Sequence, residues 1–200
     1  MIAPVLQFDD FASDARAVRD AVISGPFETV TGPDGAKYTG ISRYEVPQWF
    51  SRIGELIGCP IIPRLAGFRL NLEGELPHSW VHSDDICAKY ATVLYLNPAE
   101  QCSGGTAFWK HKQTGMTRLP SDTEIQSSGC VPLNFHRWMT AEWKNLSAWE
   151  QYAMVPMQFN RFITYPTCFF HSRFPFEAFG KGPEDGRLVW VCFYDKAGEA

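Results

Sequence analysis

The sequence has no pair of closely spaced cysteines, no run of basic residues and no long apolar stretch. Its six cysteines include no CxxC pair, which excludes the spacing of zinc ribbons and dithiol redox sites and predicts reduced, mostly buried thiols. Eighteen basic residues against 22 acidic ones give a net charge of −4, which argues against a nucleic-acid partner. Because no apolar run is long enough for a signal peptide or a transmembrane helix, we expect a cytoplasmic protein without a membrane partner.

The length of 200 residues predicts one domain over residues 1–200. A chain of this size buries enough surface to fold without a disulfide or a structural metal, so a metal site needs a chemical argument of its own. We divide the predicted domain into helical support at residues 1–60, a core at 61–111 and 159–195, and an insert or lid at 112–158. The last segment is longer than an ordinary connection in a compact domain.

Two helices are predicted before most of the strand-like sequence. Apolar residues recur at helical spacing between Asp9 and Ile23, and a second helix begins at Pro47 and is terminated by Gly58. The segment from Thr29 to Ser42 has no period and is expected to form a loop or an irregular hairpin. The later segment around Thr140 to Gln151 is expected to be helical.

Five later segments are short, apolar and bounded by turn residues, which predicts strands. They are Gly67–Leu72, Ala88–Leu96, Thr106–Lys110, Phe159–Tyr165 and Arg187–Tyr194. Helices followed by strands favour a mainly β, α+β fold, with an antiparallel sheet system and helices packed on one side of it.

His82-Ser-Asp84 is the most informative short motif. Side chains two residues apart on an extended chain point to the same side, so this imidazole and this carboxylate can meet one metal ion. His171, which follows a later predicted strand, can supply a third ligand. The motif alone has a simpler reading as a polar loop pair, and His171 alone has one as a hydrogen-bonded core histidine.

Arg187 stands at the start of a predicted strand that is otherwise apolar. A buried guanidinium is costly unless it meets a carboxylate, so Arg187 is a candidate clamp for a dicarboxylate cosubstrate. A structural ion pair is the alternative reading.

These elements occur in an order that resembles the Fe(II)- and 2-oxoglutarate-dependent dioxygenases, on the prolyl-hydroxylase-like side of that superfamily and among its small bacterial members. The resemblance covers roughly residues 68 to 195 and rests on several motifs in sequence. They are His82-Ser-Asp84, Ala91-Thr-Val-Leu-Tyr-Leu-Asn97, Gly104-Gly105-Thr-Ala-Phe108, Asn160-Arg-Phe-Ile-Thr-Tyr-Pro166, His171 and Arg187-Leu-Val-Trp-Val-Cys-Phe-Tyr194.

The resemblance implies a double-stranded β-helix, or jelly roll, that binds Fe(II) and 2-oxoglutarate. It implies that His82, Asp84 and His171 are the catalytic iron ligands. It also implies that Arg187, helped by Tyr95, holds the distal carboxylate of 2-oxoglutarate. The reaction expected with O2 is hydroxylation of a C–H bond in a small molecule or a peptidyl side chain, because halogenating relatives lack the carboxylate that Asp84 provides.

Three features depart from the family pattern. The gap between His171 and Arg187 is longer than usual, and Lys181 stands at the usual distance, so Lys181 remains a second candidate for the carboxylate. Val189 stands where the family often has a serine. The 112–158 segment has no family counterpart, and we expect it to determine the substrate.

Two other functions remain open from the residues alone. One is a cupin-like metal-binding jelly roll that uses no keto acid, although this chain lacks the H-x-H cluster typical of such proteins. The other is a non-catalytic β-sandwich binding module whose tryptophan-rich insert contacts a partner.

Tyr95 can equally be a residue that only packs within the sheet. His111 and His136 are expected on the surface or in the lid, and a zinc pair of His78 with His82 is discounted because the surrounding sequence favours extended chain.

Overall fold

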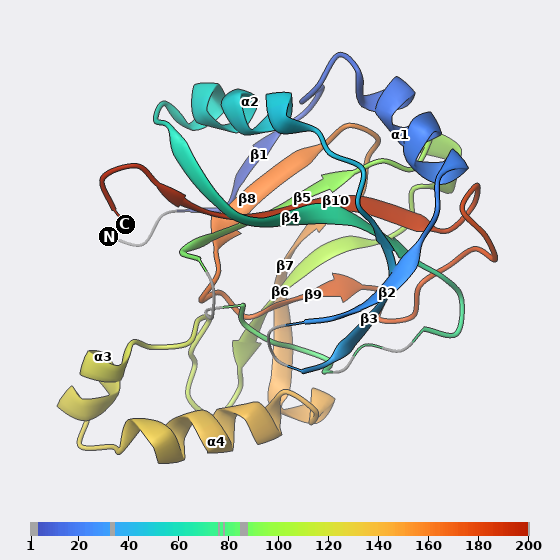
Figure 1. The fold of residues 1–200 in the computed structure, drawn as a ribbon. Helices are drawn as coiled ribbons and strands as arrows, with labels where there is room; N and C mark the ends of the chain where they lie inside the picture. Colours follow the sequence, from blue (N-terminus) through green and yellow to red (C-terminus); the bar gives the residue numbers. More distant parts are fainter. Residues whose placement is uncertain (1–3, 33–34, 76, 78, 85–87, 200) are drawn as a thin grey trace.

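A computed structural model describes residues 4–32, 35–75, 77, 79–84 and 88–199. Within these residues, seven strands form one antiparallel sheet, here called sheet A, and three form a second, sheet B (Figure 1). The strand order in sheet A is β1 (Leu6–Phe8), β8 (Phe162–Pro166), β5 (Tyr90–Tyr95), β10 (Arg187–Lys196), β4 (Ile61–Asn71), β3 (Lys37–Ser42) and β2 (Glu28–Thr31). The order in sheet B is β7 (Trp149–Pro156), β6 (Gly105–His111) and β9 (His171–Phe174).

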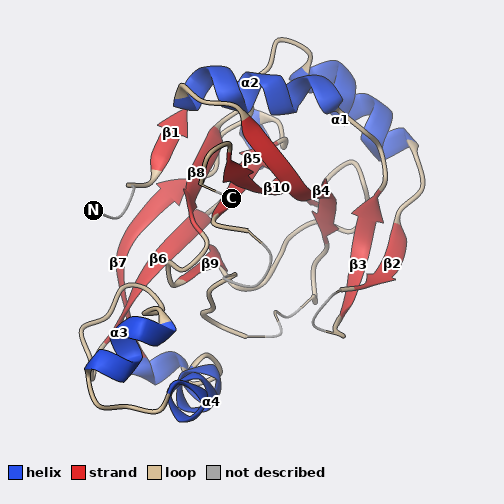
Figure 2. Ribbon diagram, turned by 60° about the vertical axis from the view of Figure 1, so that its left-hand side comes forward, coloured by secondary structure: helices blue, strands red, loops and turns tan. Residues whose placement is uncertain are grey.

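Two helices cover the face of sheet A that points away from sheet B (Figures 1 and 2). Helix α1 (Ala15–Ser24) and helix α2 (Pro47–Ile57) turn their apolar sides toward the sheet, where Trp49 packs edge-on against Trp190 with ring centroids 5.2 Å apart. This core includes Val22, Ile53, Phe68 and Leu94. The predicted packing of helices on one side of an antiparallel sheet is confirmed.

The bounds of α2 agree with the sequence prediction, and those of α1 do not. Pro47 begins α2, where its missing N–H costs no hydrogen bond, and Gly58 ends the helix in a left-handed conformation with φ of 75°. Helix α1 begins at Ala15 instead of Asp9. The residues before it are used otherwise, because Asp9 forms an ion pair with Arg161 and β1 joins the edge of sheet A.

Alternate residues of the sheet A strands face sheet B and form a second core. Val93, Tyr95 and Val189 from sheet A pack with Phe108 from β6 in this layer. The opposite side of sheet B packs against the 112–158 segment, where Trp109 and Trp149 meet Met139 of helix α4 (Pro132–Glu142). A short helix, α3 (Asp122–Ser127), precedes α4, and the two lie beyond the ends of β6 and β7 (Figure 2).

Two short 3-10 turns complete the described elements, Ala99–Gln101 and Leu146–Ala148. The hairpin of β2 and β3 lies within the segment from Thr29 to Ser42 and the residue before it, with a register shift between Glu28 and Val30. Of the two expectations for that segment, the irregular hairpin is confirmed.

The insert is partly helical, as expected, but the placement of its helix around Thr140 to Gln151 is wrong. Helix α4 ends at Glu142, and the chain forms β7 from Trp149 to Pro156, which pairs with β6 over its length. Glu150, Gln151, Ala153 and Met154 are residues that favour helices, and pairing with β6 overrides that preference. The core of sheet B therefore extends into the range assigned to the insert.

The thiols are less buried than expected. Cys192 is buried, but Cys130 is exposed and Cys59 and Cys102 are half-buried. No disulfide bond joins the cysteines that the structure describes. In the same part of the chain, no helix is long and apolar enough to span a membrane.

Candidate metal centre

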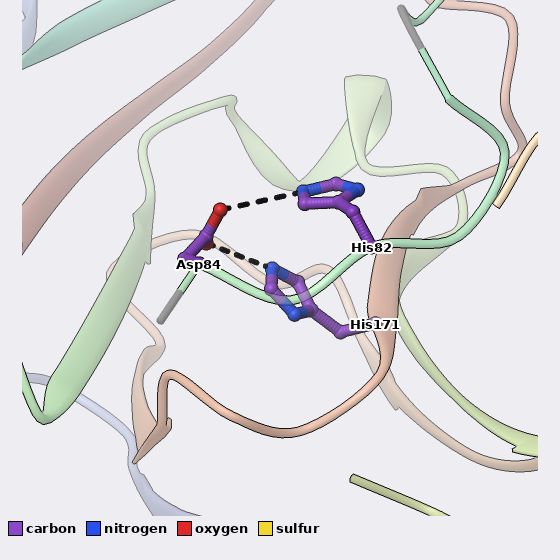
Figure 3. Close-up of side chains that lie close together, drawn as sticks. All are labelled: His82, Asp84 and His171. Carbon is purple, nitrogen blue, oxygen red and sulfur yellow. Dashed lines mark ion pairs between the residues drawn. The ribbon is translucent and has the colours of Figure 1, made fainter. Parts of the chain in front are cut away.

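The side chains of His82, Asp84 and His171 lie together between the start of β9 and the segment that precedes β5 (Figure 3). Two backbone hydrogen bonds join His82 and His171, from His82 N to His171 O at 3.1 Å and from His171 N to His82 O at 2.9 Å. The amide of Asp84 donates to the carbonyl of Thr167 at 2.8 Å. The motif is thus held as an extra piece of extended chain beside β9, which aims both of its side chains at His171.

The three side chains present nitrogen and oxygen atoms to a common point. Asp84 Oδ2 lies 3.1 Å from His171 Nε2, and Asp84 Oδ1 lies 3.7 Å from His82 Nε2. One possible ligand atom from each residue falls within 4.8 Å of the others. Two imidazoles and one carboxylate on one side form the donor set that suits a non-heme Fe(II) ion and leaves further coordination positions open.

The protonation states of His82 and Asp84 suit metal ligands. Burial, together with the charge of His171, lowers the pKa of His82 to about 4, so this imidazole is neutral near pH 7. Burial opposes ionisation of Asp84, but the charge and hydrogen bond of His171 prevail and lower the pKa of the carboxyl. Burial likewise opposes the charged form of His171, yet its contacts with Asp84 raise the pKa of that imidazole. A metal ion would replace the proton that His171 Nε2 shares with Asp84.

The second nitrogen of His171 has a fixed partner. Its Nδ1 lies 2.9 Å from the carbonyl oxygen of Phe169 and donates to it. A hydrogen bond of this kind orients a ligating imidazole and leaves Nε2 for the metal.

Tyr165, which the sequence analysis did not single out, forms a wall of the centre. Its ring packs edge-on against His171 with centroids 4.9 Å apart and also contacts Phe108. Burial and the charge of Asp84 raise the pKa of Tyr165 well above its ordinary value, so the phenol stays protonated. The signal that could have found it is alternation, because Tyr165 shares a strand face with Ile163 in the core between the sheets.

Arg187 lies at the start of β10 with only 7% of its surface exposed. Its guanidinium carbon is 6.0 Å from the centre of the Tyr95 ring, and its Nη1 donates to Asn71 Oδ1 at 3.4 Å. Burial lowers the pKa of Arg187. Its Nε is buried without a hydrogen-bond partner, and in the described part of the chain no carboxylate forms an ion pair with it. A buried cation with an unused donor is poised for an anionic ligand.

Tyr95 faces the same space as Arg187 but is engaged elsewhere. Its hydroxyl lies 2.7 Å from Thr106 Oγ1 on β6, so the side chain bridges the two sheets. Burial raises the pKa of Tyr95, which keeps the hydroxyl protonated and able to donate a hydrogen bond.

The comparison with known proteins places the chain in a family. Residues 69–194 match the model of a family described as a family of unknown function, DUF6445, and this range is more than half of the chain. The chain belongs to DUF6445. The matched range contains His82, Asp84, His171, Tyr95 and Arg187. No curated protein matches the sequence.

Solved structures share the fold of this DUF6445 chain. AviO1 from Streptomyces viridochromogenes Tue57 is 13% identical, with a TM-score of 0.54 over 98% of this chain and 91% of its own. SnoK, a non-heme α-ketoglutarate-dependent carbocyclase from nogalamycin biosynthesis, is 12% identical, with a TM-score of 0.51 over 95% of this chain and 78% of its own. HygX from Streptomyces hygroscopicus, solved with iron bound, is 9% identical, with a TM-score of 0.51 over 97% of this chain and 83% of its own. At these identities the similarity shows a common fold that is mainly β with few helices.

The other candidates of the DUF6445 chain lie apart from the centre. Lys181 is exposed in the loop before β10, and its backbone amide donates to Asp185 Oδ1 at 2.9 Å. His136 pairs with Asp122 at 2.7 Å near the surface. His78 lies outside the described residues.

Of the two expectations for His111, the surface or the lid, the surface is wrong. The DUF6445 chain buries this histidine to 1% exposure, with its ring between those of Trp138 and Trp149. It joins β6 to the 112–158 segment, and its Nδ1 lies 3.0 Å from Thr114 Oγ1.

Proposed function

We propose that the chain is an Fe(II)- and 2-oxoglutarate-dependent oxygenase that hydroxylates a C–H bond of a small molecule or a peptidyl side chain. The observation that carries the proposal is the convergence of His82, Asp84 and His171, together with a buried arginine, Arg187, that has no carboxylate partner among the described residues. In our proposal the three ligands bind Fe(II), and the arginine binds 2-oxoglutarate.

In this proposal, His82 Nε2, His171 Nε2 and one Asp84 oxygen hold Fe(II). Arg187 holds the distal carboxylate of 2-oxoglutarate, and the protonated Tyr95 hydroxyl donates to the same group. The bound pair of cofactors supplies activation of O2 and oxidation of the substrate, whereas the protein positions the reactants and excludes water. Asp84 fills the ligand position that a halide needs in halogenating enzymes, which favours hydroxylation.

The shared fold supports the general kind of enzyme. SnoK is named as an α-ketoglutarate-dependent enzyme, and α-ketoglutarate is another name for 2-oxoglutarate. HygX was solved with iron bound. In our proposal the two sheets form the double-stranded β-helix of that enzyme class, residues 1–200 act as one oxygenase domain, and the protein works in the cytoplasm with O2 as co-reactant.

The exposed lysine offers the weaker clamp for the cosubstrate. Lys181 lies in solvent, where a carboxylate contact is screened, whereas Arg187 opens a strand of the inter-sheet layer that also contains Tyr95 and Val189. We therefore assign the carboxylate to Arg187.

Succinate formation tests the proposal. Purified protein loaded with Fe(II) in air is expected to convert 2-oxoglutarate to succinate slowly without substrate, and His82→Ala is expected to lose this turnover. His136→Ala is the matched control, because it removes a histidine that lies apart from the centre. Iron-loaded protein that binds no 2-oxoglutarate would contradict the proposal and favour a cupin-like metal-binding protein. Protein that binds no metal would contradict it and favour a non-catalytic binding module.

A further inference from the structure

Two arginine side chains contact the carboxylate of Glu75 next to the candidate metal centre, and a third, Arg187, is linked to it through Asn71. Arg69 Nη2 donates to Glu75 Oε1 at 2.6 Å, and Arg173 Nη1 lies 3.8 Å from the same oxygen. Asn71 donates from Nδ2 to both oxygens of Glu75, at 3.0 and 3.1 Å, and its Oδ1 accepts from Arg187 Nη1. Arg187 thus belongs to a larger cationic group that its role toward 2-oxoglutarate does not explain.

Strand alternation places this group between the two sheets. Arg69 lies opposite Val189, and Asn71 lies opposite Arg187, in the pairing of β4 with β10. Since Val189 belongs to the core between the sheets, Arg69 and Asn71 point to the same side as it does. On β9, Arg173 is two residues from His171 and shares its face of the strand.

The charges of this group do not balance. Among the described residues, Glu75 is the one carboxylate in ion-pair contact with Arg69 or Arg173, and none contacts Arg187. Three guanidinium groups against one carboxylate leave two excess positive charges. The side chains of Arg69 and Arg173 are only 20% and 12% exposed, so water compensates little of this excess.

Unused donors point the same way. The Nε of Arg69 is buried and has no hydrogen-bond partner in the part of the chain that the structure describes, and the same holds for the Nε of Arg187. Arg173 is held by its backbone contacts, with Nε donating to the carbonyl of Phe176 at 2.7 Å and Nη2 donating to the carbonyl of Glu75. Among the described residues, its Nη1 has only the long contact to Glu75. Buried donors without acceptors are costly in a folded protein unless a ligand supplies the acceptors.

We propose that Arg69 and Arg173 form a subsite for a carboxylate of the substrate, with Glu75 as their resident counter-ion. The inference rests on the proposed function, in which the distal carboxylate of 2-oxoglutarate neutralises Arg187. One excess positive charge then remains on Arg69 and Arg173. The substrate class is therefore an acid, such as an amino acid or another carboxylated small molecule.

A carboxylate fits this subsite better than a bulkier anion. Glu75 shows that the arginines and Asn71 already accommodate a planar carboxylate from one side. Guanidinium groups bind such a planar anion through paired donors. Glu75 holds the two arginines in place, and the subsite uses their remaining donors.

Two binding measurements on the full chain, anaerobic and loaded with Fe(II), test the subsite. The first is the affinity for 2-oxoglutarate, which we expect Arg187→Gln to weaken about tenfold or more and Arg69→Gln and Arg173→Gln to change less than about threefold. The second, at saturating 2-oxoglutarate, is the rise in melting temperature with acetate, with acetamide as the neutral control and inorganic phosphate as the bulkier anion. Wild type is expected to respond to acetate more strongly than to acetamide or phosphate.

The variants separate the two proposals. We expect Arg69→Gln and Arg173→Gln to weaken acetate binding about tenfold, while Arg69→Lys retains part of it and Arg43→Gln, which alters an exposed ion pair with Glu28, retains all of it. Equal responses to acetate in wild type and both glutamine variants would overturn the subsite. So would a loss of 2-oxoglutarate affinity in Arg69→Gln or Arg173→Gln as large as that in Arg187→Gln. Wild type that binds no 2-oxoglutarate overturns the proposed function instead.

Discussion

The two faces of sheet A are made by alternate residues of the same strands, yet they bury different kinds of group. On β10, Leu188 and Trp190 face the helices and pack in the core formed by apolar side chains of the helices and the sheet. Their neighbour Val189 faces sheet B, and Arg187 lies on that side with its guanidinium near Tyr95. One strand therefore contributes to a packed core on one side and to a polar, charged layer on the other.

The two faces of sheet A therefore have different roles, one in stability and the other in the chemistry of the candidate site. Apolar side chains that fill the helix side gain free energy from burial alone. On the inner side, Arg187 is buried with an unused donor, and Tyr95 and Tyr165 carry hydroxyl groups into the same layer. These buried charged and hydroxyl groups do not contribute to stability as apolar side chains would, and their retention in the interior is typical of a functional site.

The largest effect is expected on the helix side. Trp190→Ala removes a fully buried ring that packs against Trp49 and should lower the free energy of unfolding by about 3–5 kcal/mol. Urea denaturation followed by circular dichroism measures it. The contrast between the faces would fail if Arg187→Gln, on the inner side, destabilised the protein as much.

A large effect on binding and a small one on stability is expected at the centre. His82→Ala removes one of three possible ligands and should weaken Fe(II) binding by more than about 100-fold. The same variant should change the free energy of unfolding of the metal-free protein by less than about 1 kcal/mol, because the His82 side chain is one-third exposed. Anaerobic metal titration and denaturation, with His136→Ala as the control, measure the two effects. A His82→Ala protein with full Fe(II) affinity would remove His82 from the centre.

A smaller change is expected for the cosubstrate clamp. Arg187→Gln should raise the dissociation constant of 2-oxoglutarate by about 10- to 100-fold, because a charged hydrogen-bonded contact is lost. Stability should stay level or rise, since the variant removes a buried, incompletely paired cation. Lys181→Gln is the control and should leave the dissociation constant unchanged. If Lys181→Gln raised the dissociation constant and Arg187→Gln did not, the residue that binds the distal carboxylate would be Lys181.

The smallest effect is expected from the metal itself. The apolar cores include none of the three possible metal ligands, so a chelator should leave the far-ultraviolet circular dichroism spectrum intact. Added Fe(II) should raise the melting temperature by only a few degrees, as for a ligand that binds a folded protein. Unfolding by the chelator would instead make the metal part of the fold.

The sequence predicts the parts of this molecule whose signals are local. Pro47 and Gly58 mark the ends of a helix. His82 and Asp84 are two residues apart, and at this spacing the side chains of an extended chain point to the same side. Strand β7 escaped prediction because its helix-favouring residues are held in a strand only by pairing with β6. Tyr165, Arg69 and Arg173 escaped for a related reason, since sheet pairing alone brings them near His171 and Arg187.

The most direct test of the central claim is the anaerobic addition of 2-oxoglutarate to the Fe(II)-loaded protein, followed by visible absorption. A keto acid that chelates iron at this centre gives a metal-to-ligand charge-transfer band. The account predicts the band for wild type and for His136→Ala, its appearance only at higher 2-oxoglutarate concentration for Arg187→Gln, and its loss in His82→Ala. Wild-type protein that binds Fe(II) and shows no band at saturating 2-oxoglutarate would contradict the assignment of the site.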